Sequence, residues 1–410
     1  MSEVSNRLRR RLIAGGAGAL AGAGLSTLSR AALAQTTTIE LPIANGSRVV
    51  ERFPEKRPMI LLTTRPPQLE TPFAVFNDGL ITPNDAFFVR YHNNGLPPSI
   101  DGDKHVIKIG GNAVAKPYEL TMAELRSAFK PVELVAVNQC SGNSRGFFNP
   151  RVTGGQSTNG AMGNARWVGV PLKDVLARAE PKNSAREVTF DGLDFALMGG
   201  GDFVKSLQMP HAMDGEVMVA YQMNGADIPY LNGFPVKLVV PGWYGTYWVK
   251  HLSDIQVIDG TLQSFWMNPG YRIPDNDCAC ATPGAPPPPT RPIGRFDVRS
   301  FITSLTNGQA VRTGQDLTVR GIAFDGGQGI TEVAWSADGG QSWREAQLGA
   351  DLGRYSFREF TFGFRAAQAG RYDLRVRAWN RAGASQPMQA LWNGPGYMRN
   401  VVESVVVTAA

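Results

Sequence analysis

The chain has 410 residues, of which 43% are hydrophobic and 19% are charged, and its net charge is +6 at pH 7. This length suits two domains of ordinary size, and the composition excludes a disordered chain. The 46 glycines and 28 prolines indicate many turns, which are more typical of β-rich folds than of helical bundles.

Residues 1–34 predict a twin-arginine export signal. Three arginines, Arg9 to Arg11, precede a Gly/Ala-rich run that ends in an A-L-A site at Ala34, in the order of a basic region, an apolar region and a cleavage site. A membrane anchor is the alternative, and Arg30 and the glycines argue against it. Because this route exports folded proteins, it predicts a periplasmic protein with a cofactor. No basic stripe indicates nucleic-acid binding.

Residues 35–285 predict a mixed α+β domain. Helix start signals and β-branched runs follow one another irregularly, which favours α+β over a doubly wound sheet. No glycine-rich phosphate-binding motif follows a strand, so nucleotide binding is not supported. Helices are expected at 121–129 and 170–179, and strands at 105–111, 132–137, 187–192, 216–223 and 234–242.

Four stretches of this domain combine reactive side chains with loop positions. In the first, FFVRYHNNGLP, an arginine and a histidine alternate along an extended segment, and in the second a cysteine ends an apolar strand and a Ser-Gly-Asn-Ser-Arg turn follows it. In the third, NGFPVKLVVPGWYGTYWVK, two lysines flank a strand and a glycine-containing loop, and the fourth, NPGYRIP, places a tyrosine on a turn. A thiolate suits a soft or high-valent transition metal, arginines suit an oxyanion, and lysines suit a cofactor phosphate. Taken singly, each has an ordinary structural explanation, such as an inert buried thiol or a solvated lysine. The candidates are Arg90, His92, Cys140, Arg145, Lys237, Lys250 and Tyr271.

The rest of the chain predicts a linker and a second domain. Cys278 and Cys280 precede the linker and suit either a disulfide or a pair of loop thiols. Residues 286–295 begin with four prolines and predict a stiff spacer. Residues 296–410 alternate polar and apolar residues over about seven short strands, with a hairpin turn at 337–340, which is typical of an immunoglobulin-like sandwich. This part has no cysteine or histidine, so we expect catalysis upstream.

Six motifs make the chain resemble the sulfite oxidase family of molybdenum enzymes. With the export signal and no haem-attachment motif, the resemblance is closest to the molybdenum subunit of bacterial sulfite:cytochrome c oxidoreductases. The resemblance implies an α+β molybdopterin-binding domain followed by an immunoglobulin-like sandwich. The motifs are FFVRYH, CSGNSR, FDGLD, AYQMNG, NGFPVKLVVPG and LWNGPGYM, between residues 87 and 398.

The resemblance also implies roles for single residues. Cys140 would be the protein thiolate on molybdenum, and Arg90, Arg145 and Tyr271 would be catalytic. The residues that would contact the molybdopterin or its phosphate are His92, Asn232, Lys237 and Lys250.

The implied reaction is the oxidation of sulfite to sulfate, with single electrons passed to a c-type cytochrome subunit or a soluble cytochrome c. The sequence leaves open whether the C-terminal domain makes a homodimer or a heterodimer. The chain also departs from the family pattern. Vertebrate relatives have histidine at Asn232, arginine at Lys237 and an arginine-containing pair at Tyr247-Trp248, and an expected substrate arginine is replaced by Pro395.

Three other functions remain as alternatives. A related molybdenum oxidoreductase would reduce sulfoxides, although such reductases generally lack the sandwich. An exported copper or electron-carrier protein would need histidines clustered around Cys140, and the four histidines do not cluster there in sequence. A purely structural, adhesive protein would leave the cysteine turn and the export route unexplained.

Overall fold

The computed structural model describes residues 37–41, 43, 45–197 and 201–410, so the predicted export signal lies outside the described part of the chain. Among the described helices, none has the length and apolar character that a bilayer crossing requires.

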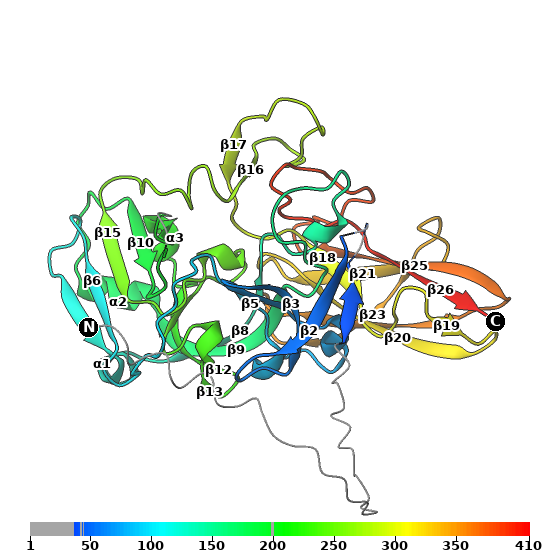
Figure 1. Cartoon of the computed structure of the whole chain (residues 1–410), viewed down its shortest axis with the longest axis horizontal. Coiled ribbons are helices and arrows are strands. Elements are labelled where there is room, and N and C mark those ends of the chain that lie inside the picture. Colours follow the sequence, from blue (N-terminus) through cyan, green and yellow to red (C-terminus); the bar gives the residue numbers. More distant parts are fainter. Residues whose placement is uncertain (1–36, 42, 44, 198–200) are drawn as a thin grey trace, which may run out of the picture. The chain divides into compact units, whose positions relative to one another are not determined.

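The described chain begins with an antiparallel five-stranded sheet, drawn in blue shades in Figure 1, that the sequence analysis did not predict. Its small core consists of Met59, Leu69, Val89 and Tyr91. The last strand ends at Arg90, so this sheet delivers the Arg90–His92 segment to the interior. Its strands are, in order, β1 (Thr38–Glu40), β2 (Ser47–Arg52), β3 (Pro58–Thr64), β4 (Pro67–Glu70) and β5 (Val89–Arg90).

Two further sheets form the centre of the α+β domain. In the first, β15 and β6 pair in parallel and the other neighbours are antiparallel. Its order is β11 (Lys205–Gln208), β10 (Glu187–Asp191), β15 (Asp254–Ile258), β6 (Val106–Gly110) and β7 (Tyr118–Thr121). The second is antiparallel, with the order β13 (Ala226–Asp227), β12 (Met218–Met223), β9 (Met162–Pro171) and β8 (Val132–Gln139), and β14 (Lys237–Val239) also pairs with β12.

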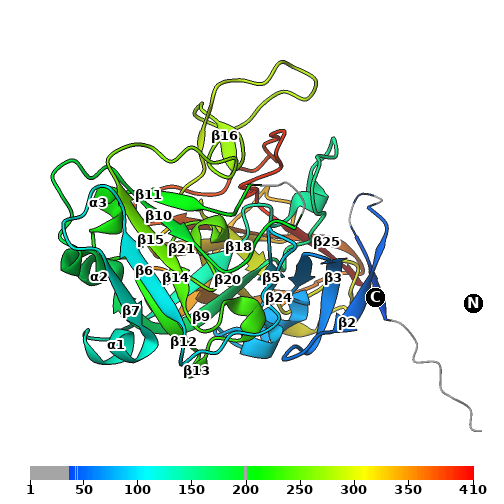
Figure 2. The ribbon, with the colours of Figure 1, turned by 60° about the vertical axis from the view of Figure 1, so that its left-hand side comes forward.

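The helices of this domain are short. In α1 (Met122–Ser127), Thr121 and Glu124 form a capping box that satisfies the first free N–H groups. The second predicted helix is α2 (Leu172–Arg178), which follows β9 directly at Pro171. α3 (Met209–Ala212) was not predicted and lies beside β10 and β11 (Figure 2). The described residues of the domain also form the 3₁₀ turns η1 (Phe73–Asn77), η2 (Asn84–Ala86), η3 (Arg145–Phe147), η4 (Tyr230–Asn232) and η5 (Gly245–Tyr247).

A small hairpin leads toward the C-terminal part. Strand β16 (Arg272–Pro274) pairs with β17 (Thr290–Pro292), which lies inside the predicted linker. Between these strands, Cys278 and Cys280 form a disulfide, which decides between the two alternatives that the sequence left open.

The C-terminal part is a two-sheet sandwich, which confirms the predicted order of an α+β domain followed by an all-β domain. The turn at 337–340 joins β21 to β22, as expected. The first sheet has the order β18 (Arg299–Ile302), β20 (Asp316–Phe324), β24 (Arg358–Arg365) and β23 (Gln347–Asp351). The second has the order β19 (Ala310–Val311), β26 (Ser404–Ala409), β25 (Gly370–Asn380), β21 (Ile330–Ser336) and β22 (Arg344–Glu345).

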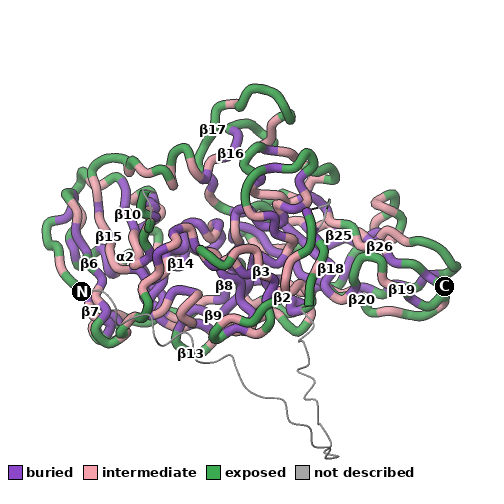
Figure 3. The backbone as a smooth tube through the Cα atoms, viewed as in Figure 1, coloured by how far each residue is buried: buried purple, intermediate pink, exposed green. Residues whose placement is uncertain are grey.

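The two parts share one of their cores. The sandwich has its own buried cluster around Val319, Val333, Leu374 and Val376. Buried residues occur in both parts of the chain (Figure 3), and the larger cluster, most of whose members belong to the α+β domain, extends into the sandwich. The sandwich side contributes Phe301, Ile322, Phe324, Tyr355 and Phe357 to it.

Candidate active site

The site is built around the turn that follows strand β8. The Cys140 N–H donates to the Ala161 carbonyl at 2.9 Å, and the Asn143 N–H donates to the Cys140 carbonyl at 3.0 Å. The Asn143 side-chain oxygen also accepts from the Ala161 N–H at 3.0 Å. Ser144 has a left-handed φ of +70°, which reverses the chain before Arg145. These contacts hold the half-buried Cys140 thiol, which is in no disulfide, at the end of the strand.

Arg145 lies in a cradle of glycines. A Cβ added at Gly142, Gly154 or Gly396 would come within 2.7, 2.6 or 3.1 Å of its side chain, so larger residues there would displace it. The guanidinium carbon lies 5.0 Å from the ring centroid of Tyr397. Within the described part of the chain, no carboxylate pairs with Arg145, and its buried Nε has no hydrogen-bond partner. A guanidinium with unused donors suits an oxyanion ligand.

His92 follows strand β5, is half-buried and packs against an aromatic ring. Its ring stacks on Phe203, with centroids 3.7 Å apart and planes 5° apart. Burial lowers the pKa of His92 well below its usual value, and the positive charges of Arg90, Lys250 and Lys205 lower it further. His92 is therefore a neutral imidazole, with one nitrogen as donor and the other as acceptor.

Tyr271 brings a phenol to this imidazole. Its hydroxyl and His92 Nε2 form a hydrogen bond, and its φ of +54° is left-handed. The ring stacks on Tyr397 at 5.4 Å and 11°, and Lys205 Nζ lies 4.9 Å from its centroid. Burial raises the pKa of Tyr271 far above neutral pH. His92 and Tyr271 are therefore both neutral, and one proton is shared in the hydrogen bond between them.

Three buried lysines, Lys56, Lys205 and Lys237, and the half-buried Lys250 surround these groups. Burial lowers the pKa of each one because the charged form loses its hydration. The pKa falls to about 7 for Lys56, Lys205 and Lys250, and well below the usual value for Lys237. For Lys250, the negative charge of Asp194 opposes this shift.

Lys237 has no negatively charged partner in the described part of the chain. Its Nζ lies 5.1 Å from the ring of Trp167 and 5.6 Å from that of Trp248. Among the residues that the structure describes, it has no hydrogen bond and no ion pair. Burying an unpaired ammonium is costly, so this position favours an anionic ligand.

Asn232 is held by Lys56. Lys56 Nζ donates to the Asn232 side-chain oxygen at 2.6 Å and to the carbonyls of Asn84 and Phe87. The Asn232 amide nitrogen donates to the Phe88 carbonyl at 3.0 Å. Asn232 thus keeps one free amide hydrogen for a ligand, and Lys56 acts as a structural support.

All the predicted site residues except Arg145 line one cavity. Together with its open mouth, it holds about 570 Å³ of space that no atom fills. Arg145 lines a neighbouring cavity, which shares Phe88, Arg90 and Cys140 with the first. The first cavity is lined by Phe88, Arg90, Tyr91, His92, Asn138, Cys140, Ser141, Asp194, Phe203, Asn232, Lys237, Gly245, Thr246, Trp248, Lys250 and Tyr271.

The donor set fits an anionic group held by a thiolate. One free thiol faces the cavity, and the cations Arg90, Lys237 and Lys250 line it. Asn138 Oδ1 and Thr246 Oγ1 are buried there without a hydrogen-bond partner in the described chain, which leaves polar atoms for a ligand to satisfy.

The sequence analysis missed several residues of the site. Lys56, Asp194, Lys205 and Tyr397 come from four distant segments. Asp194 ends the FDGLD motif and Tyr397 lies in LWNGPGYM, so two of the motifs behind the resemblance could have pointed to them, although neither residue was among the candidates. A lysine within the apolar FVKSL stretch is the one visible signal for Lys205, because strand lysines normally face solvent.

Comparison with known proteins identifies relatives of both parts. Residues 93–266 match the oxidoreductase molybdopterin binding domain, and residues 290–410 match the Mo-co oxidoreductase dimerisation domain. Human mitochondrial sulfite oxidase is 33% identical over 283 residues, which are 67% of this chain and 50% of the relative. The chain thus spans about half the length of the vertebrate sulfite oxidases that it matches.

Two further relatives cover more of this chain. Sulfite oxidase of Arabidopsis thaliana is 30% identical over 309 residues, which cover 70% of this chain and 75% of that protein. The crystal structure of the sulfane dehydrogenase SoxCD from Paracoccus pantotrophus superposes with a TM-score of 0.72 at 26% identity, over 85% of this chain and 88% of that one.

Proposed function

Because the chain belongs to the sulfite oxidase family of molybdenum enzymes, we propose that it oxidises sulfite to sulfate in the periplasm. The observation that carries the proposal is the meeting of one free thiol, Cys140, with the cations Arg90, Arg145 and Lys237, which have no carboxylate partner among the described residues. In the overall reaction, water supplies the new oxygen of sulfate, and two protons and two electrons leave. Two ferric c-type cytochromes each accept one electron.

The cofactor is molybdenum bound to a molybdopterin, and it supplies oxygen-atom transfer and the two-electron change when bound. In this proposal, Cys140 is the protein ligand of the metal. Lys237 and Lys250 would neutralise the negative charge of the molybdopterin. The free amide hydrogen of Asn232 and the His92 segment would line the rest of its binding site. The fit is supported by the unpaired Lys237 ammonium and by the orphaned oxygens of Asn138 and Thr246.

The substrate would be held by arginines and a phenol. Arg90 and Arg145 line the two cavities that meet at Cys140, so both reach the same region. Their positive charge attracts a sulfite dianion and offsets repulsion from an anionic cofactor. Tyr271 donates its hydroxyl proton toward the bound oxyanion or toward His92, which accepts it in the neutral form.

Location and partners follow from features outside the cavity. The arginine-led segment before Ala34 supports twin-arginine export, and the Cys278–Cys280 disulfide suits an oxidising compartment. The match to a dimerisation domain over residues 290–410 supports a dimer. A c-type cytochrome, as a bound subunit or a soluble protein, is the proposed electron acceptor.

The test is sulfite-dependent reduction of a c-type cytochrome by the purified, molybdenum-loaded chain, with oxygen as a control acceptor. We expect cytochrome reduction with little oxygen consumption. In Cys140→Ser, sulfite oxidation should fall by at least about a hundredfold, since the protein ligand of the metal is changed. A Cys140→Ser protein with full turnover would contradict the assignment.

A second candidate substrate is a sulfane sulfur compound, because the SoxCD sulfane dehydrogenase matches over most of both chains. Cytochrome reduction with a protein-bound or organic persulfide, and none with sulfite, would select it. Oxidation of a reduced dye by a sulfoxide, with sulfite inactive, would instead show a reductase.

A further inference from the structure

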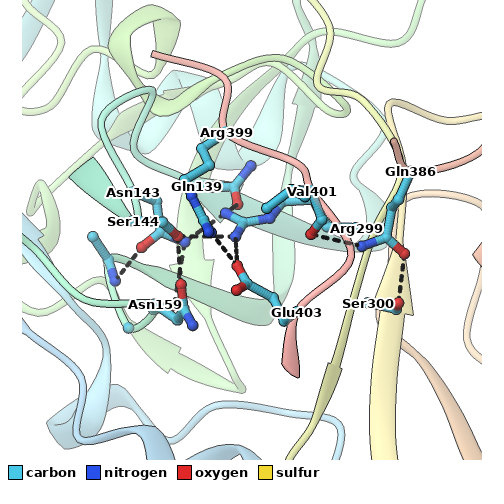
Figure 4. Close-up of polar contacts among 12 residues, drawn as sticks. Gln139, Asn143, Ser144, Asn159, Arg299, Ser300, Gln386, Arg399, Val401 and Glu403 are labelled. Atoms are coloured by element: carbon cyan, nitrogen blue, oxygen red, sulfur yellow. Dashed lines mark hydrogen bonds and ion pairs between the residues drawn. The ribbon is translucent and has the colours of Figure 1, made fainter. Parts of the chain in front are cut away.

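Arg299 begins strand β18 of the sandwich, but its side chain reaches the cysteine turn of the other domain. Nη1 donates to the Gln139 side-chain oxygen at 3.0 Å, and Nη2 donates to Ser144 Oγ at 2.9 Å (Figure 4). Gln139 immediately precedes Cys140, and Ser144 immediately precedes Arg145. One side chain of the C-terminal domain therefore contacts both ends of the turn that carries the candidate metal ligand.

The partners of Arg299 are themselves tied into the turn. Ser144 Oγ donates to the Asn159 side-chain oxygen at 2.5 Å, and the Gln139 oxygen also accepts from Asn143 Nδ2 at 3.3 Å. Because Ser144 is in the left-handed region, its backbone conformation is unfavourable for a residue with a Cβ and needs support from its surroundings. The hydrogen bond from Arg299 supplies part of that support.

Arg299 is charged although it is only 1% exposed. Burial lowers its pKa to about 10, and the carboxylate of Glu403 opposes this shift. Glu403 Oε1 lies 3.3 Å from Arg299 Nη2 and is also bound by Arg399. A buried ion pair of this kind adds little net stability compared with apolar packing. The main effect of the buried guanidinium is instead to fix the positions of its hydrogen-bond partners, Gln139 and Ser144.

We propose that Arg299 is a positioning residue of the active site, which fixes Gln139 and Ser144 and thereby the placement of the Cys140 thiolate relative to the Arg145 guanidinium. The inference rests on the proposed role of Cys140 as metal ligand. It makes the sandwich a part of the active site as well as a candidate dimerisation surface.

The experiment compares Arg299→Met with Arg377→Met in the molybdenum-loaded, full-length protein. Arg377 is a matched control, since it donates to the Gln386 carbonyl at 3.0 Å and to Ser385 Oγ at 2.8 Å within the sandwich. The measurements are molybdenum per chain, kcat and KM for sulfite, and the paramagnetic resonance spectrum of the one-electron-reduced centre. For Arg299→Met we expect kcat/KM to fall by about ten- to a hundredfold, as when a partner that orients a metal ligand is lost.

The spectrum separates positioning from general destabilisation. Arg299→Met should change it at a molybdenum content close to that of the parent protein, whereas Arg377→Met should leave it unaltered. Unchanged kcat/KM and an unchanged spectrum in Arg299→Met, or equal changes in both variants, overturn the proposal. If Arg299→Met does not fold, Ser144→Gly takes its place, because glycine accepts the left-handed backbone and the loss of the CH2OH group removes the hydroxyl that Arg299 binds.

A second measurement does not depend on the reaction. In the cofactor-free, full-length chain, Cys140 is the one cysteine outside the disulfide, so its alkylation by a maleimide reports how well the turn is held. We expect alkylation to be about tenfold faster in Arg299→Met than in Arg377→Met, because the turn opens more often. Equal rates would refute the positioning role. A parent protein that does not oxidise sulfite would refute the proposed function and leave this comparison valid.

Discussion

At the scale of single residues, Lys205 supplies a positive charge beside Tyr247, where an arginine was expected from the resemblance. Its Nζ lies 4.6 Å from the ring centroid of Tyr247 and 4.9 Å from that of Tyr271, and donates to the Trp266 carbonyl at 2.5 Å. No carboxylate among the described residues pairs with it. Tyr247 stands where the family resemblance led us to expect an arginine, so Lys205 is placed to restore part of the lost charge beside it.

The titration of Lys205 predicts a pH dependence of anion binding. Burial lowers its pKa to about 7, so the ammonium is present below that pH and is lost above it. We expect the inhibition constant of sulfate, a dianion throughout, to rise by about tenfold between about pH 6 and pH 9, which equals ~1.4 kcal/mol. Inhibition of sulfite oxidation at each pH measures it.

Substitutions of Lys205 isolate its share of this dependence, because Lys250 also titrates near pH 7. Lys205→Met should reduce the slope and weaken sulfate inhibition at low pH. Lys205→Arg should keep inhibition strong at high pH, because a guanidinium stays charged. The same slope in Lys205→Met as in the parent protein would show that Lys205 plays no part.

Site residues that belong to a local motif can be predicted from the sequence, and those brought in from distant segments cannot. Cys140 and Arg145 belong to one continuous turn, so a local motif identifies them. Lys205 becomes a site residue only because strand β11 packs against η5 and the Trp266 carbonyl covers its ammonium. That placement depends on segments about 40 and 60 residues away in the sequence, which no local pattern encodes.

At the scale of elements, helix α1 was predictable because its start is encoded within four residues. The Thr121 hydroxyl accepts from the Glu124 N–H at 3.2 Å, and the Glu124 carboxylate accepts from the Thr121 N–H at 3.1 Å. By contrast, β9 contains Gly163 and Gly169 and is stabilised by pairing with β8 and β12 on its two sides. The strand pattern of β9 is weak, and its partners are distant in sequence, so it was missed.

The capping box predicts a measurable stability effect. Thr121→Ala removes the hydroxyl acceptor at the start of α1, and we expect the free energy of unfolding to fall by about 1 kcal/mol. Denaturant unfolding of the full chain measures this change. Ser127→Ala, at the exposed end of the same helix, is the control and should change stability by less than about 0.5 kcal/mol. Equal losses in both variants would argue against the capping role.

At the scale of the whole molecule, the predicted order of domains is confirmed, and the two parts also share one buried cluster, which the sequence did not predict. Residues of the sandwich such as Phe301, Phe324 and Phe357 are buried in the core of the α+β domain. Composition and a proline-rich segment indicate a boundary in sequence. Neither feature shows that apolar side chains of the sandwich fill part of the core of the α+β domain.

The shared core predicts an asymmetric response to truncation. A chain ending at residue 285 loses these aromatic side chains, and we expect it to aggregate and to retain no molybdenum. Residues 296–410 alone keep the cluster around Val319, Val333 and Leu374, and we expect a soluble protein with a cooperative thermal transition. Solubility, molybdenum content and circular dichroism on heating measure these outcomes. A soluble, molybdenum-loaded chain of residues 1–285 would contradict the prediction.

The site lysines make the stability of the folded chain depend on whether the cofactor is bound. A chain without its anionic cofactor must either desolvate the ammonium groups of Lys205, Lys237 and Lys250 or leave them neutral. An anion that binds only the folded chain removes this penalty and adds its own binding free energy to stability. The unfolding temperature then reports whether a molecule contains the cofactor. A purified sample with mixed loading would melt in two steps, and a phosphate or sulfate buffer would hide the lower step by occupying the same charges.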